Sequence, residues 1–459
     1  MEAVLDPYDR MNRSALAVVV LAAGQGTRMK SALPKVLHAI GGRPMLAHVL
    51  AVTKDMQAAR VVVVTAPGAD QVAKLADVWG AEATVQDRQL GTGHAVLSAE
   101  AALAGFEGNL LVLFGDAPLL TAATLGRLVA RLGEGADIAA LGFRAADPTG
   151  YGRMVADGDS LVRIVEHKDA NQAERGIDRC FAGMLAGRAS LIFELLHKVG
   201  NRNAQGEFYL TDVIAIARER GLHCAIVEGP QSEMLGVNSR AQLAEGEAAF
   251  QARARAALMD AGVSMLAPET VYLSADTIIE PDTVIGQFVV FGPGVTVKRG
   301  AQIRSFCHIE NSEIGERAIV GPFARLRGGA KLGDDVDIGN FVELKNAHLE
   351  KGVKAHHLTY LGDAHVGEKA NIGAGTITCN YDGFAKHRTE IGAGAFIGSN
   401  SALVAPVTIG KDALVAAGSV ITRNVEANAL AVGRARQEVK PGGAEQIRTQ
   451  NKARRDRNA

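Results

Sequence analysis

The first residues that could do chemistry lie in a glycine-containing loop from Leu21 to Met29, directly after an apolar run. Its glycines would let backbone N–H groups approach phosphate oxygens closely, and Arg28 and Lys35 place two cations nearby. The loop is not a Walker loop, because no Gly-Lys-Ser/Thr follows, and it lacks the third glycine of a dinucleotide fingerprint. The pattern indicates phosphate binding, with ordinary solvated surface charge as the alternative for each cation.

Two more polar loops follow apolar segments in the first half of the chain. Gln86 precedes Gly91 and Thr92, where a helix should begin, and a helix N-terminus suits a phosphate or the edge of a base. Asp116 ends a strongly apolar run, and ligands of parallel sheets bind beyond the ends of such strands. A single aspartate after a strand is more often a turn former, so Asp116 alone does not establish a metal site.

The second half of the chain holds a histidine that could act as a general base. An imidazole has an ordinary pKa of about 6.5 and can take a proton from an attacking amine at neutral pH. A lone histidine beside an apolar position is more often a packed side chain than a catalyst. His357 stands out because other polar residues gather in the same part of the chain, namely Lys345, Tyr360, Asn371, Asn380 and Tyr381.

The first half must position its loops with alternating strands and helices. Short apolar runs predict strands at 16–21, 60–65, 82–86, 109–114 and 137–143. Amphipathic stretches between them predict helices at 44–57, 69–79, 91–104 and 121–132. This alternation predicts a Rossmann-like α/β domain, a parallel sheet with helices on both faces and ligands beyond the carboxyl ends of the strands.

The second half is organised by an apolar residue at nearly every sixth position. Six is not a helical period, but it is a multiple of the strand period of two, so these residues can all face one way. Such a repeat predicts a parallel β-helix in which three six-residue faces make one coil. The repeating residues are Ile279, Ile285, Phe291, Val297, Ile303 and Ile309, then Ile314, Val320, Leu326, Leu332, Ile338 and Leu344, then Tyr360, Val366 and Ile372, and finally Ile391, Ile397, Leu403, Ile409, Val415 and Ile421.

The repeat is expected to fail in two places, and both carry polar residues. Leu344 and Tyr360 are sixteen positions apart, which is not a multiple of six. The second interruption runs from Thr378 to Arg388. We expect binding residues in both, because loops that leave a rigid scaffold tend to carry function.

The composition excludes several classes of protein. The net charge is −1, so no basic field indicates nucleic acid as a partner. The four cysteines are far apart and lack CxxC spacing, which is typical of reduced thiols in a cytoplasmic protein. The apolar run at 15–24 is too short to span a bilayer, so we expect a buried strand and no stable membrane insertion.

These patterns divide the chain into five segments. Residues 1–14 are expected to be a disordered leader, in which Met11 is an alternative start. Residues 15–238 form the first domain, and 239–262 form a linker helix that Ser239 caps and a glycine ends. Residues 263–436 form the β-helix, and 437–459 form a flexible basic tail.

The motifs of the first half resemble those of the sugar-phosphate nucleotidyltransferases. The matching segments are 21–29, 34–35, Gln86 with 91–93, 115–119, 151–153, 164–169, 203–212 and 236–238. With the hexapeptide half added, residues 15–436 resemble the family of bifunctional N-acetylglucosamine-1-phosphate uridyltransferases/glucosamine-1-phosphate acetyltransferases. The resemblance implies acetyl transfer from acetyl-CoA to glucosamine-1-phosphate, then uridylyl transfer from UTP to N-acetylglucosamine-1-phosphate with release of pyrophosphate.

For the uridylyl-transfer site, the resemblance implies Mg²⁺ held by Asp116 and Asn238. Arg28 and Lys35 would be catalytic residues that stabilise the triphosphate. The family usually has an asparagine that contacts the sugar where this chain has Phe181, so the effect on sugar preference is an open question. The residues implied to bind UTP or the UDP-sugar product are Leu21, Ala22, Gly24, Lys35, Gln86, Gly91, Thr92, Gly152, Glu166 and Asn238.

For the acetyl-transfer site, the resemblance implies that His357 is the general base and that Glu343 orients it. In the family the β-helix is left-handed and forms a homotrimer, with each acetyl-transfer site between subunits. The residues implied to bind glucosamine-1-phosphate are Arg327, Lys345, Tyr360 and Asn371, and those implied to bind acetyl-CoA are Ala374, Asn380, Tyr381, Ser399, Ala417 and Arg434.

Two other functions remain open from the sequence. The chain could be a sugar-phosphate nucleotidyltransferase whose β-helix serves only assembly or regulation, in which case His357 would be dispensable. It could also be a metal-dependent β-helix hydratase fused to a nucleotide-binding module. That function needs histidines around zinc, and residues 355–358 give it little support.

Overall fold

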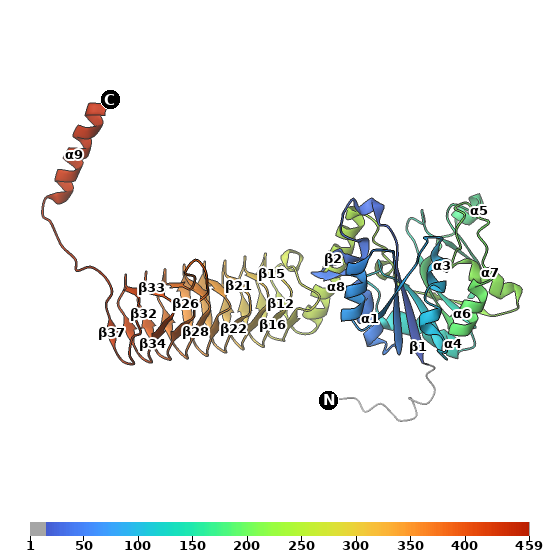
Figure 1. Cartoon of the computed structure of the whole chain (residues 1–459), viewed down its shortest axis with the longest axis horizontal. Coiled ribbons are helices and arrows are strands. Elements are labelled where there is room, and N and C mark those ends of the chain that lie inside the picture. Colours follow the sequence, from blue (N-terminus) through green and yellow to red (C-terminus); the bar gives the residue numbers. More distant parts are fainter. Residues whose placement is uncertain (1–14, 459) are drawn as a thin grey trace, which may run out of the picture. The chain divides into compact units, whose positions relative to one another are not determined.

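The structure is a computed structural model that describes residues 15–458. The expected leader, with Met11, lies outside the described residues. The chain divides into two compact units, and the boundary falls after Ala256. Figure 1 shows the elements of both units, which are described separately below.

The first unit is built on one nine-stranded sheet in the order β5-β4-β1-β6-β10-β7-β11-β9-β8. The neighbours β5, β4, β1 and β6 run parallel, as expected. β10 lies antiparallel between β6 and β7, so an antiparallel strand that was not expected separates two of the predicted parallel strands. The strands are β1 (Leu16–Ala22), β4 (Arg60–Thr65), β5 (Glu82–Val85), β6 (Asn109–Phe114), β7 (Ile138–Arg144), β8 (Arg153–Asp157), β9 (Ser160–Val165), β10 (Arg179–Arg188) and β11 (Cys224–Glu228), with a separate pair β2 (Ala39–Ile40) and β3 (Arg43–Pro44).

Helices cover both faces of this sheet, which confirms the expected layering (Figure 1). Successive residues of β1 point into two different hydrophobic cores. Val18 shares its core with residues of α1, α2 and α4, and Val19 shares the other core with residues of α3, α6 and α7. The helices are α1 (Met45–Asp55), α2 (Asp70–Val78), α3 (Thr92–Leu97), α4 (Ala122–Gly133), α5 (Gln172–Arg175), α6 (Ala189–Leu196) and α7 (Asp212–Glu219).

The parallel strands β1 and β6 position the first group of polar loops. Leu21 near the end of β1 pairs with Phe114 at the end of β6. The loops that follow the two strands therefore leave the sheet at the same edge, the glycine loop from one and Asp116 from the other.

A long helix, α8 (Arg240–Asp260), follows the first sheet. The Ser239 hydroxyl accepts the backbone N–H of Gln242 at 3.2 Å, as an N-cap does. Gly262 has a φ of 94° just after the helix, where the left-handed conformation favours glycine. The helix expected at 239–262 therefore exists, with both of its expected end signals.

The second unit is a left-handed parallel β-helix whose short strands stack into three sheets, and each coil visits sheet I, then II, then III. Sheet I contains β12 (Ser264–Met265), β14 (Val284–Ile285), β17 (Gln302–Ile303), β20 (Ile319–Val320), β23 (Asp337–Asn340), β26 (Lys354–His357), β29 (Asn371–Ile372), β32 (Phe396–Ile397), β35 (Leu414–Val415) and β37 (Leu430–Ala431). Sheet II contains β15 (Val290–Phe291), β18 (His308–Ile309), β21 (Arg325–Arg327), β24 (Glu343–Lys345), β27 (Tyr360–Gly362), β30 (Ile377–Cys379), β33 (Ala402–Val404) and β36 (Val420–Ile421). Sheet III contains β13 (Ile278–Ile279), β16 (Val295–Val297), β19 (Ser312–Ile314), β22 (Ala330–Leu332), β25 (His348–Leu349), β28 (Ala364–Val366), β31 (Thr389–Ile391) and β34 (Val407–Ile409).

The apolar ladder forms the core of the β-helix, but its first expected interruption is wrong. Leu349, Ala355 and Leu361 carry the ladder through the stretch after Leu344 and are fully buried. Tyr360 is not a rung, because it precedes the buried Leu361 and is only half-buried. The step from Leu344 to Leu349 is five residues and Ala355 is small, so a search for large residues at six-residue spacing loses the register there.

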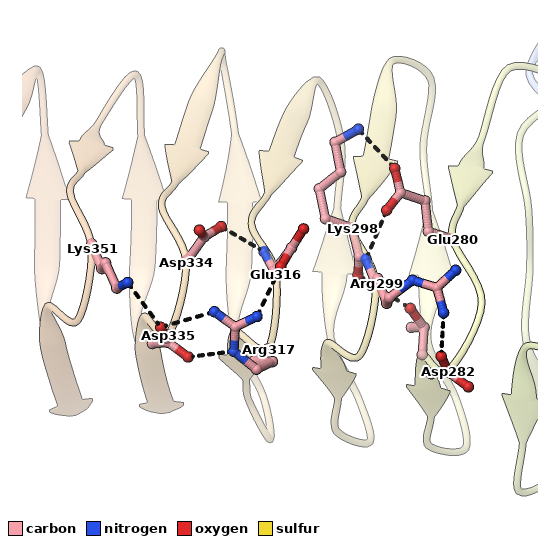
Figure 2. A network of polar contacts seen from close by, with 10 residues as sticks. Glu280, Asp282, Lys298, Arg299, Glu316, Arg317, Asp334, Asp335 and Lys351 are labelled. Carbon is pink, nitrogen blue, oxygen red and sulfur yellow. Dashed lines mark hydrogen bonds and ion pairs between the residues drawn. The ribbon is translucent and has the colours of Figure 1, made fainter.

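The turns from sheet III to sheet I form an ionic edge of the β-helix, drawn in Figure 2. Within it, Lys298 binds Glu280 at 2.8 Å, and Arg317 binds Asp335 at 2.8 Å. Lys351 of the next coil lies 3.8 Å from the same Asp335. These charges neutralise one another between coils while remaining exposed, which indicates that this edge faces water.

The turns from sheet I to sheet II form an aromatic edge made of Phe288, Phe306, Phe323 and Phe341. Their rings stack with centroids 5.2, 4.8 and 5.1 Å apart in successive coils. Each phenylalanine has a φ between 55° and 63°, in the left-handed region that bulky residues rarely adopt. Each is also 45–55% exposed, so this edge presents a continuous apolar ridge.

The expected flexible tail contains a helix, α9 (Gly443–Asn458), whose residues are all exposed except the half-buried glycine at its start. Among residues 15–458, no helix is long and apolar enough to cross a membrane.

Candidate active sites

Lys35, Asp116 and Asn238 meet at the carboxyl edge of the first sheet, although they are far apart in the sequence. The Lys35 Nζ donates to Asp116 Oδ2 at 2.5 Å and to Asn238 Oδ1 at 2.9 Å. Asp116 follows β6, Lys35 lies in a short turn after the glycine loop, and Asn238 precedes α8. The structure thus brings three of the expected site residues together around one cationic group.

The two oxygens that share the Lys35 ammonium group fit the donor set of a Mg²⁺ ion. Mg²⁺ prefers oxygen ligands and often takes only one or two from the protein, with water and substrate phosphates supplying the rest. Among residues 15–458, no group of three or more His, Cys, Asp or Glu side chains is arranged to hold a metal ion. A Mg²⁺ ion bound to Asp116 and Asn238 would therefore take its remaining ligands from water and a bound phosphate.

The glycine loop needs Gly26 for steric reasons. Gly26 has a φ of 61°, and a Cβ there would lie 2.7 Å from the Cβ of Lys35. Leu21–Ala22 is buried at the end of β1, whereas Gly24 is exposed with open space around it. Arg28 is exposed and forms no ion pair with another residue of the described range 15–458. The loop therefore offers backbone N–H groups and an unpaired cation, as a phosphate site requires.

Gln86, Gly91 and Thr92 form one braced loop beside the glycine loop. The buried Gln86 amide donates to Gly91 O at 3.1 Å and lies 3.0 Å from His94 Nδ1. The Thr92 hydroxyl accepts the backbone N–H of Leu210 at 3.0 Å. These expected nucleotide-binding residues lie together, and their side chains are held in place by neighbouring segments.

Gly152 and Glu166 lie together at the other end of this site. A Cβ on Gly152 would lie 3.7 Å from Glu166 Oε2, so the absence of a side chain leaves space in front of the carboxylate. Burial raises the pKa of Glu166, and the nearby carboxylate of Asp212 raises it further, while a hydrogen bond from Thr211 opposes the shift. In its charged form, this half-buried carboxylate can accept hydrogen bonds from a sugar.

Phe181 packs beside this end of the site. It lies in β10, and its backbone N–H donates to Gly152 O at 2.8 Å. Its side chain is buried in the hydrophobic core. Phe181 can therefore influence a sugar only by shape and packing.

His357 lies in the β-helix at the end of β26, exposed, next to Asn340 of β23. The two residues occupy the same register on neighbouring strands, and His357 Nδ1 lies 2.8 Å from Asn340 Oδ1. An amide oxygen accepts hydrogen bonds, so this contact places the proton of a neutral imidazole on Nδ1. The lone pair is then on Nε2, which is the arrangement that a general base needs.

Glu343, which was expected to orient His357, has a different partner. Its Oε1 accepts the Arg327 Nε at 2.7 Å and lies 3.8 Å from Arg325. Arg327 and Lys345 occupy the same register on β21 and β24. Glu343 therefore holds one of two neighbouring cations that could bind a sugar phosphate.

The second expected interruption is a true insertion, residues 379–388, in the turn from sheet II to sheet III. Asn380 is buried and donates to Asp363, and a Cβ at Gly362 would meet both Asn380 and the Tyr360 hydroxyl. Tyr381 is exposed, and Lys386 lies over its ring at 4.0 Å. Tyr360, Asn380 and Tyr381 are thus gathered at this insertion edge.

The other expected acetyl-CoA residues form a strip that begins at His357. Ala374, Ser399 and Ala417 occupy the corresponding turns of the next three coils, so the strip is about 14 Å long at about 4.8 Å per coil. Arg434 lies at its far end, with Cδ 3.8 Å from the position of a Cβ on Gly418. Asn371 lies apart from this strip, on the outer face of sheet I. In these coils the positions of the four phenylalanines are held by Leu358, Gly375, Asn400 and Gly418. The two glycines leave space for an elongated ligand.

The acetyl-site residues therefore lie on two edges of the β-helix. His357, Ala374, Ser399 and Ala417 are on the edge between sheets I and II, while Asn380 and Tyr381 are on the insertion edge. A strand of sheet II separates the two edges. A ligand that touches both must cross this sheet or lie between two copies of the chain.

Sequence reasoning missed Asn340, the partner of His357. The two residues are 17 positions apart, which is the length of this particular coil. A coil length of 17 would have identified the pair, but the six-residue repeat suggested 18.

Comparison with known proteins covers both units. The family described as "MobA-like NTP transferase domain" matches residues 18–182, and the family described as "Bacterial transferase hexapeptide (six repeats)" matches residues 311–346 and 388–423. The chain is 53% identical over 444 residues to "Bifunctional protein GlmU" of Jannaschia sp., covering 96% of this chain and 97% of that protein. Proteins of the same name from Azorhizobium caulinodans and Bradyrhizobium sp. are 54% and 55% identical, and each match covers 95% of this chain and 98% of the relative.

Proposed function

This chain belongs to the family of bifunctional GlmU proteins, and we propose from that premise which residues perform its two reactions. The protein makes UDP-N-acetylglucosamine for peptidoglycan and lipopolysaccharide precursors. It transfers an acetyl group from acetyl-CoA to glucosamine-1-phosphate, and then a uridylyl group from UTP to N-acetylglucosamine-1-phosphate. The observation that carries the assignment of the uridylyl site is the meeting of Lys35, Asp116 and Asn238 at one point.

In uridylyl transfer, an oxygen of the sugar phosphate attacks the α-phosphorus of UTP, and pyrophosphate leaves. Negative charge grows on the phosphate oxygens and on the leaving group, so catalysis depends on positioning and charge compensation. Arg28 and Lys35 supply positive charge, and the glycine loop supplies backbone N–H groups. Gln86, Gly91 and Thr92 hold the nucleotide, while Gly152 and Glu166 hold the sugar.

Asp116 and Asn238 would hold Mg²⁺ in place of the Lys35 contact that they share in this structure. When bound, the ion would supply positive charge to the phosphates. Lys35 would then be released to contact a phosphate oxygen.

In acetyl transfer, the amine of glucosamine-1-phosphate attacks the thioester carbonyl of acetyl-CoA. His357 Nε2 takes the proton that the amine loses, a C–N bond forms, and the thiolate of CoA leaves. Arg327, Lys345, Tyr360 and Asn371 would hold the sugar phosphate. Acetyl-CoA would lie along Ala374, Ser399, Ala417 and Arg434, with Asn380 and Tyr381 contributed from the insertion edge.

The functional assay is a two-product measurement on the purified protein. With glucosamine-1-phosphate, acetyl-CoA, UTP and Mg²⁺, the wild type should release both CoA thiol and pyrophosphate. Each variant is then given the substrate of each reaction separately. Asp116→Ala should not release pyrophosphate with N-acetylglucosamine-1-phosphate, but should still release CoA thiol with glucosamine-1-phosphate. His357→Ala should release pyrophosphate from the first substrate but no thiol with the second. A His357→Ala protein with full thiol release would refute the assignment and favour a β-helix used only for assembly.

The exposed aromatic edge supports a homotrimer. Four stacked phenylalanines, half-exposed in a strained conformation, are costly unless they are covered. Every copy of the chain presents the same ridge, and in a closed three-fold assembly the ridges of three copies can meet around the symmetry axis. Three copies would also bring the two edges that carry acetyl-site residues to a shared interface.

Light scattering after size-exclusion chromatography tests the trimer. The wild type should have the mass of three chains, and the double variant Phe306→Ser/Phe323→Ser should shift toward smaller species. Val78→Ser, an exposed apolar residue of the first unit, is the matched control and should leave the mass unchanged. A double variant that remains a trimer would contradict the role of the aromatic edge.

We place the protein in the cytoplasm. Its substrates UTP and acetyl-CoA are cytoplasmic metabolites. All four cysteines are free thiols, and Cys180, Cys224 and Cys307 are buried, as expected in a reducing compartment.

A further inference from the structure

We propose that residues 203–211, here called the strap, couple the two ligands of the uridylyl-transfer site. Binding of UTP would strengthen binding of the sugar phosphate, and the reverse. The inference rests on the proposed uridylyl-transfer function. It assigns a role to a sequence motif that contains none of the expected ligand-binding residues.

One side of the strap is hydrogen-bonded to residues 86–93, here called the nucleotide loop. Phe208 N donates to Leu90 O, and Gly93 N donates to Phe208 O, both at 2.8 Å. Leu210 N donates to the hydroxyl of Thr92 at 3.0 Å. Gly91 has a φ of 111°, and a Cβ there would lie 2.6 Å from Phe208 O. The nucleotide loop and the strap are therefore in direct backbone contact.

The other side of the strap is fastened to the sugar loop, residues 166–169. The hydroxyl of Thr211 donates to Glu166 Oε1 at 3.1 Å. Ala204 N donates to Asp169 Oδ1 at 2.9 Å, and Lys168 Nζ donates to Gln205 Oε1 at 2.6 Å. The sugar loop and the strap are thus joined by three hydrogen bonds.

Two consecutive residues of the strap connect the two ligand sites most directly. Leu210 binds Thr92 on the nucleotide side, and Thr211 binds Glu166 on the sugar side. Both strap residues are buried. If Thr92 shifts when the nucleotide binds, Leu210 and the adjacent Thr211 must move with it, and Thr211 is the hydrogen-bond donor to Glu166. Alternatively, the bond between Thr211 and Glu166 resists the shift.

The strap is stiff enough to transmit such a shift. The Asn203 side chain accepts the N–H groups of Gln205 and Glu207 at 3.2 Å each. Its amide also donates to Glu207 O at 2.6 Å, which closes the turn. Coupling between two ligands is reciprocal by thermodynamic necessity, and typical factors are about 5- to 150-fold.

Isothermal titration calorimetry tests the coupling without catalysis. The probes are N-acetylglucosamine-1-phosphate and the non-hydrolysable α,β-methylene analogue of UTP, with Mg²⁺ present. We expect saturation with the analogue to lower the dissociation constant of the sugar phosphate at least about fivefold in the wild type. The sugar phosphate should lower the dissociation constant of the analogue by the same factor.

Thr211→Val removes the hydroxyl that reaches Glu166, and the coupling factor should fall below the wild-type value. Thr211→Ser keeps the hydroxyl and should restore the coupling. Thr53→Val is the matched control, because Thr53 is also buried and its hydroxyl binds Leu50 O within α1 at 2.8 Å, away from both loops. Thermal melting would show that each variant is folded.

The outcomes separate the strap from the proposed function. If the wild type binds neither probe, the uridylyl-transfer function itself is overturned. If it binds both probes without coupling, or if Thr211→Val retains the wild-type coupling, the role of the strap is overturned and the function stands.

Discussion

Replacing Asn340 by alanine should slow acetyl transfer by a limited and calculable amount. Asn340 Oδ1 lies 2.8 Å from His357 Nδ1 and keeps the lone pair of the imidazole on Nε2. The substitution removes this acceptor and leaves the backbone bond from Leu358 N to Asn340 O, at 3.1 Å, in place. The β-helix should therefore fold normally, and the imidazole should become free to rotate and to change tautomer.

The expected loss follows from the value of one hydrogen bond. A typical intramolecular hydrogen bond contributes about 0.5–1.5 kcal/mol net, and about 1.4 kcal/mol corresponds to a tenfold change in rate. The kcat of acetyl transfer should therefore fall about 2- to 13-fold. Loss of the base itself, in His357→Ala, should cost about 10²- to 10⁴-fold.

The assay is thiol release from acetyl-CoA with glucosamine-1-phosphate as acceptor, with kcat and KM measured separately over a range of pH. Asn340→Ala should lower kcat with little change in KM, because Asn340 acts through His357 and not on the substrate. Asn340→Asp keeps the acceptor and should retain most of the activity. Its negative charge favours the protonated imidazolium, which cannot act as a base. As the pH is lowered, kcat of this variant should therefore begin to fall at a higher pH than kcat of the wild type.

Two results would refute this reasoning. Unchanged kcat in Asn340→Ala would mean that the contact does not orient the base. A loss as large as that of His357→Ala, with normal thermal stability, would mean that Asn340 touches the substrate directly.

Three further predictions concern the glycine loop, the half-buried carboxylate of Glu166 and the ladder. Gly26→Ala should lower uridylyl transfer by about 10²-fold by displacing Lys35, with acetyl transfer intact, and Gly126→Ala on the open surface of α4 is the control. Burial raises the pKa of Glu166, so its charged form destabilises the folded state once the pH exceeds that pKa. Glu166→Gln should therefore raise the melting temperature above neutral pH but not near about pH 4, while raising KM for the sugar phosphate; an equal shift at both pH values would contradict this. Leu361→Ala should cost about 2–5 kcal/mol in denaturant unfolding, and a cost below about 1 kcal/mol would show that Leu361 is not a rung.

The sequence predicted best those elements that local pattern alone determines. The strands at 60–65 and 109–114 have the expected bounds, because continuous apolar runs are typical of buried parallel strands. β10 (Arg179–Arg188) was missed because its alanines and glycines have low strand propensity. This segment forms a strand because it pairs with β6 on one side and β7 on the other. Contacts between residues far apart in the sequence could not be predicted either. Lys35 is 81 residues from Asp116 and 203 residues from Asn238.

The site residues that were expected individually could not be assigned partners from the sequence. Thr92 was expected to bind the nucleotide, but its hydroxyl also accepts a bond from Leu210, 118 residues away. The orienting partner of His357 required the local coil length. Both depend on register, which short-range patterns do not determine.

The coil lengths explain why the insertion of the β-helix lies where it does. From Ile285 to Ile421, every step between rungs of sheets I and II is six residues, and so is every step between sheets III and I. Only the turn from sheet II to sheet III varies: five residues after Ile309, Leu344 and Leu361, and thirteen after Thr378. The constant edges carry ladders that need equal spacing, stacked rings on one and alternating charges on the other. The remaining edge carries a short row of hydrogen bonds from Asn346 and Asn380 to Asp363, and it is the edge at which the chain changes length. The insertion with Asn380 and Tyr381 leaves the scaffold there.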